Sequence, residues 1–155
     1  MGAWGSGVFE NDSALDWMGD LNDSDDPSLL RKKLEEVISH SGSKLNKPSI
    51  FGRILGRRAS MEQLDADVCS EALVAAELVV SALGHPPNDL PDSARSWLEK
   101  HSSTIGKDLV KLAVLSVQKI RADSELKELW EEGESQKKMW HSVMADLEKR
   151  LRLAS

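Results

Sequence analysis

Hydrophobic residues recur at helical spacing along most of the chain, and no segment sustains the alternation of apolar and polar positions that marks a strand. The strongest pattern covers residues 67–83, where apolar side chains span a broad arc of the helix. Such an arc is typical of a helix that other helices surround. The pattern therefore predicts an all-α fold, an irregular single-domain helical bundle of about six or seven helices around this central apolar helix.

Local signals predict where the other helices begin and end. Asn11 or Asp12 can cap a first helix, because a side-chain oxygen at that position accepts a hydrogen bond from a free N–H of the first turn. Asp26 and Pro27 predict the start of a second helix, and Gly42 predicts its end. The further helical patterns lie within residues 94–101, 109–120, 124–130 and 140–151.

Two segments of the 155-residue chain do not fit a helix. Residues 1–10 begin with several glycines and predict an irregular arm, anchored by Trp4 and Phe9. Residues 43–60 hold five basic residues, two glycines and one proline, which predicts a basic loop or insertion. A loop of this length is either a solvated insertion or a functional segment.

Charge and composition limit the partners that we expect. The net charge of −6 disfavours general nucleic-acid binding, since phosphates repel an acidic protein, and it favours a basic protein partner. The longest apolar run is shorter than the roughly 20 residues that a membrane span needs, so we expect no membrane partner. A lone cysteine, Cys69, and the lack of a secretory signal predict a cytoplasmic location. The sequence makes no prediction of oligomeric state.

Most motifs that carry catalysis or bind a cofactor are missing. The chain has no glycine loop of the kind that cradles phosphates, no nucleophile elbow, and no histidine or cysteine partners at zinc-ligand spacing. We therefore predict no cofactor, and the sequence favours a protein that is not an enzyme without deciding the point.

The acidic residues near the N-terminus form the most informative polar pattern. Asp12, Asp16 and Asp20 are spaced by four, so a continuous helix carries them on one side, where like charges repel. Solvation, a basic protein surface or a hard metal ion could each accommodate them. The segment is not a calcium-binding EF-hand, because the central glycine of that loop is absent.

A second acidic feature is Glu77, which interrupts the apolar pattern of the central helix. If its carboxylate is buried there, it must pair with a cation or a strong hydrogen-bond donor. Structural pairing and a functional acid both remain open interpretations.

The first 17 residues, MGAWGSGVFENDSALDW, resemble the opening of a bacterial family of small uncharacterised proteins, domain of unknown function 4259. Similar stretches follow at residues 72–77, 82–86, 90–91 and 124–132, and residues 140–151 fit the family's last helix. The stretch 43–60 resembles the family less. The resemblance implies a bacterial, cytoplasmic, helical protein, and it implies no reaction.

The polar motif at the start of the chain has two interpretations. It is either a structural knot of helix caps and aromatic packing or a binding site. The candidate interaction or structural residues are Trp4, Phe9, Glu10, Asn11, Asp12, Asp16, Trp17, Asp20 and Glu77.

These observations favour a protein–protein interaction module, with an immunity-type inhibitor of a basic toxin or nuclease as its specific form. Complementary charge would speed association with such a partner. One alternative is a metal-dependent hydrolase that uses Glu10, Asp12, Asp16 and Glu77. Another is a small cytoplasmic regulator or adaptor that acts through residues 43–60.

Overall fold

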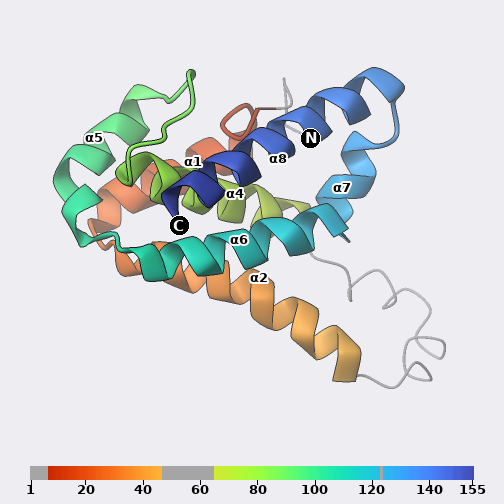
Figure 1. Ribbon diagram of the computed structural model, residues 1–155, viewed down its shortest axis with the longest axis horizontal. Helices are drawn as coiled ribbons and strands as arrows, with labels where there is room; N and C mark the ends of the chain where they lie inside the picture. Colours follow the sequence, from red (N-terminus) through yellow and green to blue (C-terminus); the bar gives the residue numbers. More distant parts are fainter. Residues whose placement is uncertain (1–6, 47–64, 123) are drawn as a thin grey trace.

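The computed structural model describes residues 7–46, 65–122 and 124–155 (Figure 1). Within these ranges the chain forms α-helices and one 3₁₀ turn, and no strand, so the predicted all-α fold is confirmed. The elements are α1 (Asp12–Ser24), α2 (Ser28–Asn46), α4 (Ala66–Ala82), α5 (Asp92–His101), η2 (Ser102–Thr104), α6 (Lys107–Ala122), α7 (Glu125–Trp130) and α8 (Glu134–Ala154).

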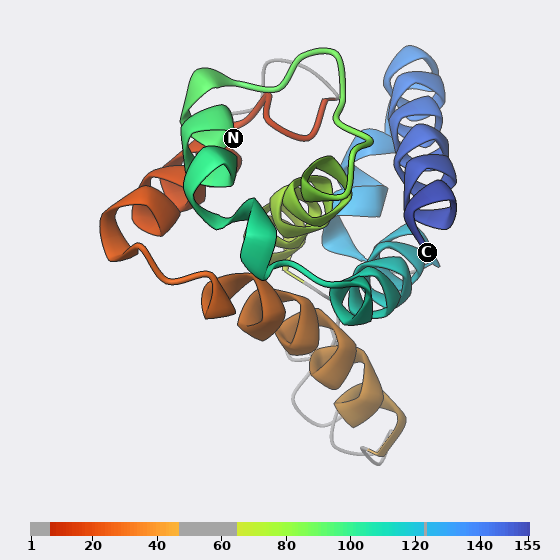
Figure 2. The same ribbon diagram turned by 60° about the vertical axis from the view of Figure 1, so that its left-hand side comes forward.

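Helix α4 is the centre of the bundle, as the broad apolar arc predicts. Figure 2 shows it in the middle of the molecule, with the other helices arranged around it. Twelve of its 17 residues are buried, and it packs against each of the six other α-helices found in the described ranges. Its observed limits differ from the predicted 67–83 by one residue at each end.

Turn chemistry fixes the ends of α4. The Asp65 side chain accepts a hydrogen bond from the Asp67 N–H at 2.7 Å and so caps the first turn. At the other end Gly84 has a φ of 99°, which favours glycine over any residue with a Cβ atom. This turn lets the His85 N–H donate to the Val80 carbonyl at 3.0 Å, and the chain then leaves the helix toward α5.

Helix α2 begins as expected but ends later than predicted. It starts at Ser28, one residue after Pro27, and the Asp26 carboxylate accepts from the Ser28 N–H at 3.0 Å. The prediction that it stops at Gly42 is wrong, because α2 continues to Asn46. An interior glycine costs a helix only about 1 kcal/mol relative to alanine, which is too little to end it by itself.

The extension of α2 also changes the predicted basic loop. Residues 43–46 are the last residues of a helix, and the remainder of the 43–60 stretch lies outside the described residues. The same is true of residues 1–6, which make up most of the predicted N-terminal arm.

One hydrophobic core joins the helices. It includes two almost fully buried tryptophans, Trp97 of α5 and Trp140 of α8. The buried Ser116 hydroxyl of α6 donates to the Leu34 carbonyl of α2 at 3.0 Å, which connects those two helices by a polar contact. None of the described helices has the length and apolar composition that crossing a bilayer requires.

Candidate functional site

Residues 7–11 form a compact turn that leads into α1. The Glu10 carboxylate accepts a hydrogen bond from the Gly7 N–H at 3.1 Å. The Asn11 side chain is the N-cap of α1: its oxygen accepts from the Ala14 N–H at 2.8 Å, while its amide nitrogen donates to the Val8 carbonyl. Glu10 and Asn11 therefore hold the backbone at the start of the helix.

The described aromatic residues of the predicted N-terminal site face the core. Phe9 is 6% exposed and Trp17 is 8% exposed, and both belong to the hydrophobic core. The Lys33 ammonium of α2 lies 6.0 Å from the centre of the Trp17 ring, within the range of a cation–π interaction. The buried side chains of Phe9 and Trp17 thus stabilise the packing of α1. The third aromatic candidate, Trp4, lies outside the described residues.

The aspartates of α1 face solvent instead. Because α1 is continuous from Asp12 to Ser24, the residues spaced by four share one side of it. Asp12, Asp16 and Asp20 are exposed, and so is Asp23 one turn further on. Within the described part of the chain, none of these four carboxylates has an ion pair or a hydrogen-bond partner. Together with Leu15, which is 38% exposed on the same side, they form what we call the acidic face.

The segment that contains the acidic face accounts for the net charge of the whole protein. Residues 10–26 contain seven acidic residues and no lysine or arginine. Since the chain carries a net charge of −6, the residues outside this segment carry a net charge of +1. The negative potential is therefore concentrated on α1 and the turn that follows it rather than spread over the surface.

Glu77, the remaining candidate residue, lies in a different environment. Its side chain is 3% exposed on α4 and accepts two hydrogen bonds from the Arg150 guanidinium of α8, at 2.6 and 3.1 Å. Arg150 also donates to the Asp146 carboxylate at 2.8 Å and to the His85 carbonyl at 3.3 Å. The guanidinium thus joins α8, α4 and the turn after α4.

Burial and pairing shift the pKa of the Glu77 carboxyl in opposite directions. Burial raises the pKa of Glu77 above its ordinary value of 4.5, because a desolvated carboxylate is disfavoured, while the Arg150 hydrogen bonds act to lower it. The two-pronged contact is the pairing that a buried carboxylate requires. Glu77 therefore fits the structural interpretation of its place in the central helix.

The candidate residues do not assemble into one catalytic centre. Glu10 and Asn11 hold a turn, Asp12 and Asp16 face solvent, and Glu77 is paired with a residue of α8. Across residues 7–46, 65–122 and 124–155, no three histidine, cysteine or acidic side chains gather closely enough to hold a metal ion.

The structure also contains contacts that the sequence analysis missed. Arg150 lies 73 residues from Glu77, and no local pattern identifies such a partner. In the same way, Lys33 of α2 pairs with Glu71 of α4 at 2.8 Å, and Arg121 of α6 pairs with Glu148 of α8 at 2.5 Å. Each of these carboxylates has its cation on another helix, in contrast to those of the acidic face.

Comparison with known proteins supplies a family. The model of a family described as "Domain of unknown function (DUF4259)" matches residues 2–49 and 46–143, and the two matched segments overlap at residues 46–49, inside the basic stretch. No curated protein and no solved structure matches the chain. Because the matched segments together cover most of its length, the chain belongs to the DUF4259 family.

Proposed function

We propose that this protein is a protein–protein interaction module whose acidic face binds a basic surface on its partner. The observation that carries the proposal is the row of four α1 carboxylates without any cation partner in the described chain. Carboxylates spaced by four on a helix repel one another by a few tenths of a kcal/mol per pair. Lysine or arginine residues of a partner would remove that repulsion and neutralise the face.

The distribution of charge supports the same proposal. A concentrated negative potential steers a basic partner toward one side of the molecule and raises the rate of association. It also disfavours binding to the phosphate backbone of nucleic acids. Leu15 adds an apolar contact within the acidic face, and the centre of an interface usually needs such a contact.

The specific role that we propose is that of an immunity-type inhibitor, which neutralises a basic toxin or nuclease by covering a basic surface. A small helical domain with a localised acidic surface fits this role. The metal-dependent hydrolase receives less support, because Glu10 holds a turn, Asp12 and Asp16 face solvent, and Glu77 is paired with a cation of α8. A regulator acting through residues 43–60 remains a prediction, since most of that stretch lies outside the described residues.

A matched pair of variants tests the acidic face. The test variant is Asp16→Asn/Asp20→Asn, and the control is Glu128→Gln/Glu132→Gln, which removes the same charge from another exposed pair spaced by four. Tagged wild type and both variants are used to capture proteins from the native host at low salt, followed by mass spectrometry. We expect one stoichiometric basic protein with the wild type and the control, and its loss with the test variant.

Two further results decide the role. If the captured protein is an inhibitory toxin, its expression alone should stop growth, and co-expression of the wild type, but not of Asp16→Asn/Asp20→Asn, should restore it. Capture should also weaken as salt rises, because exposed charges are screened. Equal capture by both variants, or the absence of any basic partner, would overturn the proposal.

A further inference from the structure

A pocket of about 360 Å³ opens beside α5, and none of the residues of the acidic face lines it. Its walls come from the last turn of α4, the connection between α4 and α5, and α5 itself. This volume lies at the small end of the roughly 300–1,000 Å³ typical of ligand sites. The lining residues include Ser81, Pro86, Leu90, Arg95, Leu98 and Glu99.

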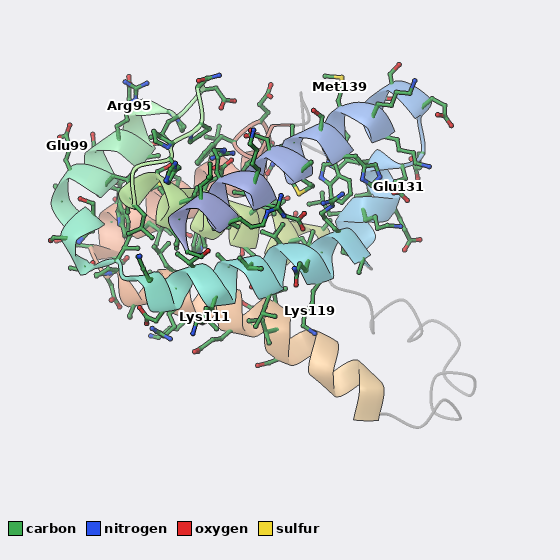
Figure 3. The ribbon with its side chains drawn as sticks, in the orientation of Figure 1. Arg95, Glu99, Lys111, Lys119, Glu131 and Met139 are labelled. Carbon is green, nitrogen blue, oxygen red and sulfur yellow. The ribbon has the colours of Figure 1, made fainter. Side chains whose placement is uncertain are left out.

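The pocket has one cationic and one anionic side chain at its edge. Arg95 and Glu99 are spaced by four on α5, and Figure 3 shows both projecting from that helix. Neither forms an ion pair with the other or with any other described residue. The Arg95 Nε–H donates to the Leu90 carbonyl at 3.3 Å, which holds the guanidinium beside the pocket and leaves its terminal nitrogens available.

The rest of the lining is mostly apolar, with one polar group of particular interest. Pro86, Leu90 and Leu98 supply apolar surface. The Ser81 hydroxyl is buried and has no hydrogen-bond partner in the part of the chain that the structure describes. A buried hydroxyl without a partner is costly, and rotation to another staggered side-chain position is open to a serine. A ligand that reaches this wall could supply the missing partner.

We propose that this pocket binds a free α-amino acid with an apolar side chain. Arg95 binds its carboxylate, Glu99 accepts from its ammonium group, and Leu90 and Leu98 pack against its side chain. The observations disfavour an inorganic phosphate, because a carboxylate stands beside the single cation of the pocket. They also disfavour a wholly apolar ligand, since it would cover both charges without pairing them.

Three related compounds test the contributions of the ligand's carboxylate and ammonium groups separately. L-leucine carries both charges, N-acetyl-leucine keeps only the carboxylate, and leucinamide keeps only the ammonium. We would titrate each into ¹⁵N-labelled wild-type protein and follow the amide resonances of residues 81–102. Saturable shifts confined to this region, with leucine bound at least about fivefold more tightly than either derivative, are the expected result.

Substitutions in the pocket make the test specific. Arg95→Gln should weaken leucine binding about tenfold, whereas Lys100→Gln, which removes a cation from the same helix outside the pocket, should leave it unchanged. Glu99→Gln should make leucine and N-acetyl-leucine bind equally. Circular dichroism verifies that each variant is folded.

Two outcomes would overturn the inference. One is the absence of shifts in residues 81–102 at about 10 mM leucine, a concentration that would reveal millimolar affinity. The other is equal binding of leucine to wild type and Arg95→Gln. Partner capture by the acidic face does not depend on either result, so this proposal and the proposed function can fail separately.

Discussion

The acidic face of α1 and the Glu77 contact show two opposite ways in which this fold carries carboxylates. Glu77 is almost fully buried and receives two hydrogen bonds from a guanidinium on another helix. Asp16 and the other three carboxylates of the acidic face are exposed and have no partner in the described chain. A buried carboxylate must be paired for the protein to fold, whereas an exposed one is accommodated by water. Unpaired exposed carboxylates are therefore the ones available to another molecule.

Because of this difference, we expect the Glu77 contact to govern the stability of the fold and the acidic face to govern binding to a partner. Removing the partner of Glu77 should damage the fold, and removing charge from the acidic face should leave the fold intact or improve it. Three substitutions, at Arg150, Asp20 and Glu131, test this separation, and the expected change in the free energy of unfolding decreases in that order.

The largest effect is expected from Arg150→Met. The substitution leaves the Glu77 carboxylate buried without its cation, which typically costs about 3 kcal/mol or more. Chemical denaturation monitored by circular dichroism at neutral pH would measure the loss. The double variant Glu77→Leu/Arg150→Met should recover most of the stability, because no buried charge is left unpaired. A loss below about 1 kcal/mol for Arg150→Met would mean that water reaches and solvates Glu77.

The contrast also explains which parts of the molecule the sequence predicts. The limits of α4 follow from a local apolar pattern, and they are correct to within one residue. The cap at Asn11 is also local, since it depends on an oxygen that reaches an N–H three residues away. The end of α2 was predicted wrongly, because a glycine signal is weak when the residues around it continue the helix.

The partner of a charged residue is harder to predict than its helix. The sequence indicates that Glu77 needs a cation if it is buried, but Arg150 becomes its neighbour only when α8 packs against α4. The exposed side of α1 is predictable from the spacing of its aspartates alone. The α5 pocket is not, because its lining comes from segments that meet only in the folded bundle.

Asp20→Asn should raise the free energy of unfolding, in contrast to Arg150→Met, and by a smaller amount. Asp20 is four residues from Asp16 and three residues from Asp23, so like charges flank it on the same side of the helix. Removing its charge should raise the free energy of unfolding by about 0.5 kcal/mol at low salt. Asp12→Asn is the comparison, because Asp12 lies in the first turn, where a negative charge is favourable.

Denaturation at two salt concentrations measures this effect. The gain from Asp20→Asn should shrink at high salt, where exposed charges are screened. A clear loss of stability would mean that Asp20 has a stabilising contact, and the acidic face would then be part of the structural framework rather than a free surface.

The smallest change in stability is expected at Glu131. Its environment lies between that of the buried, paired Glu77 and that of the exposed, unpaired aspartates of α1. Its side chain is 23% exposed, and it accepts hydrogen bonds from the Lys127 ammonium at 2.9 Å and from the His141 ring at 2.8 Å. These two bonds, with the one from Lys127 the stronger influence, hold the pKa of the Glu131 carboxyl below its ordinary value of 4.5.

A lowered pKa in the folded protein means that the ionised form of Glu131 stabilises the fold. That contribution is complete above the ordinary pKa and is lost as the pH falls through the lowered one. Glu131→Gln should therefore lose less stability than the wild type on acidification from about pH 6 to about pH 3. Glu132→Gln should follow the wild-type curve, because Glu132 is exposed and no described residue pairs with its side chain. If denaturation midpoints of all three proteins decline in parallel, the contacts of Glu131 contribute nothing to the fold, and it belongs with the unpaired carboxylates of α1.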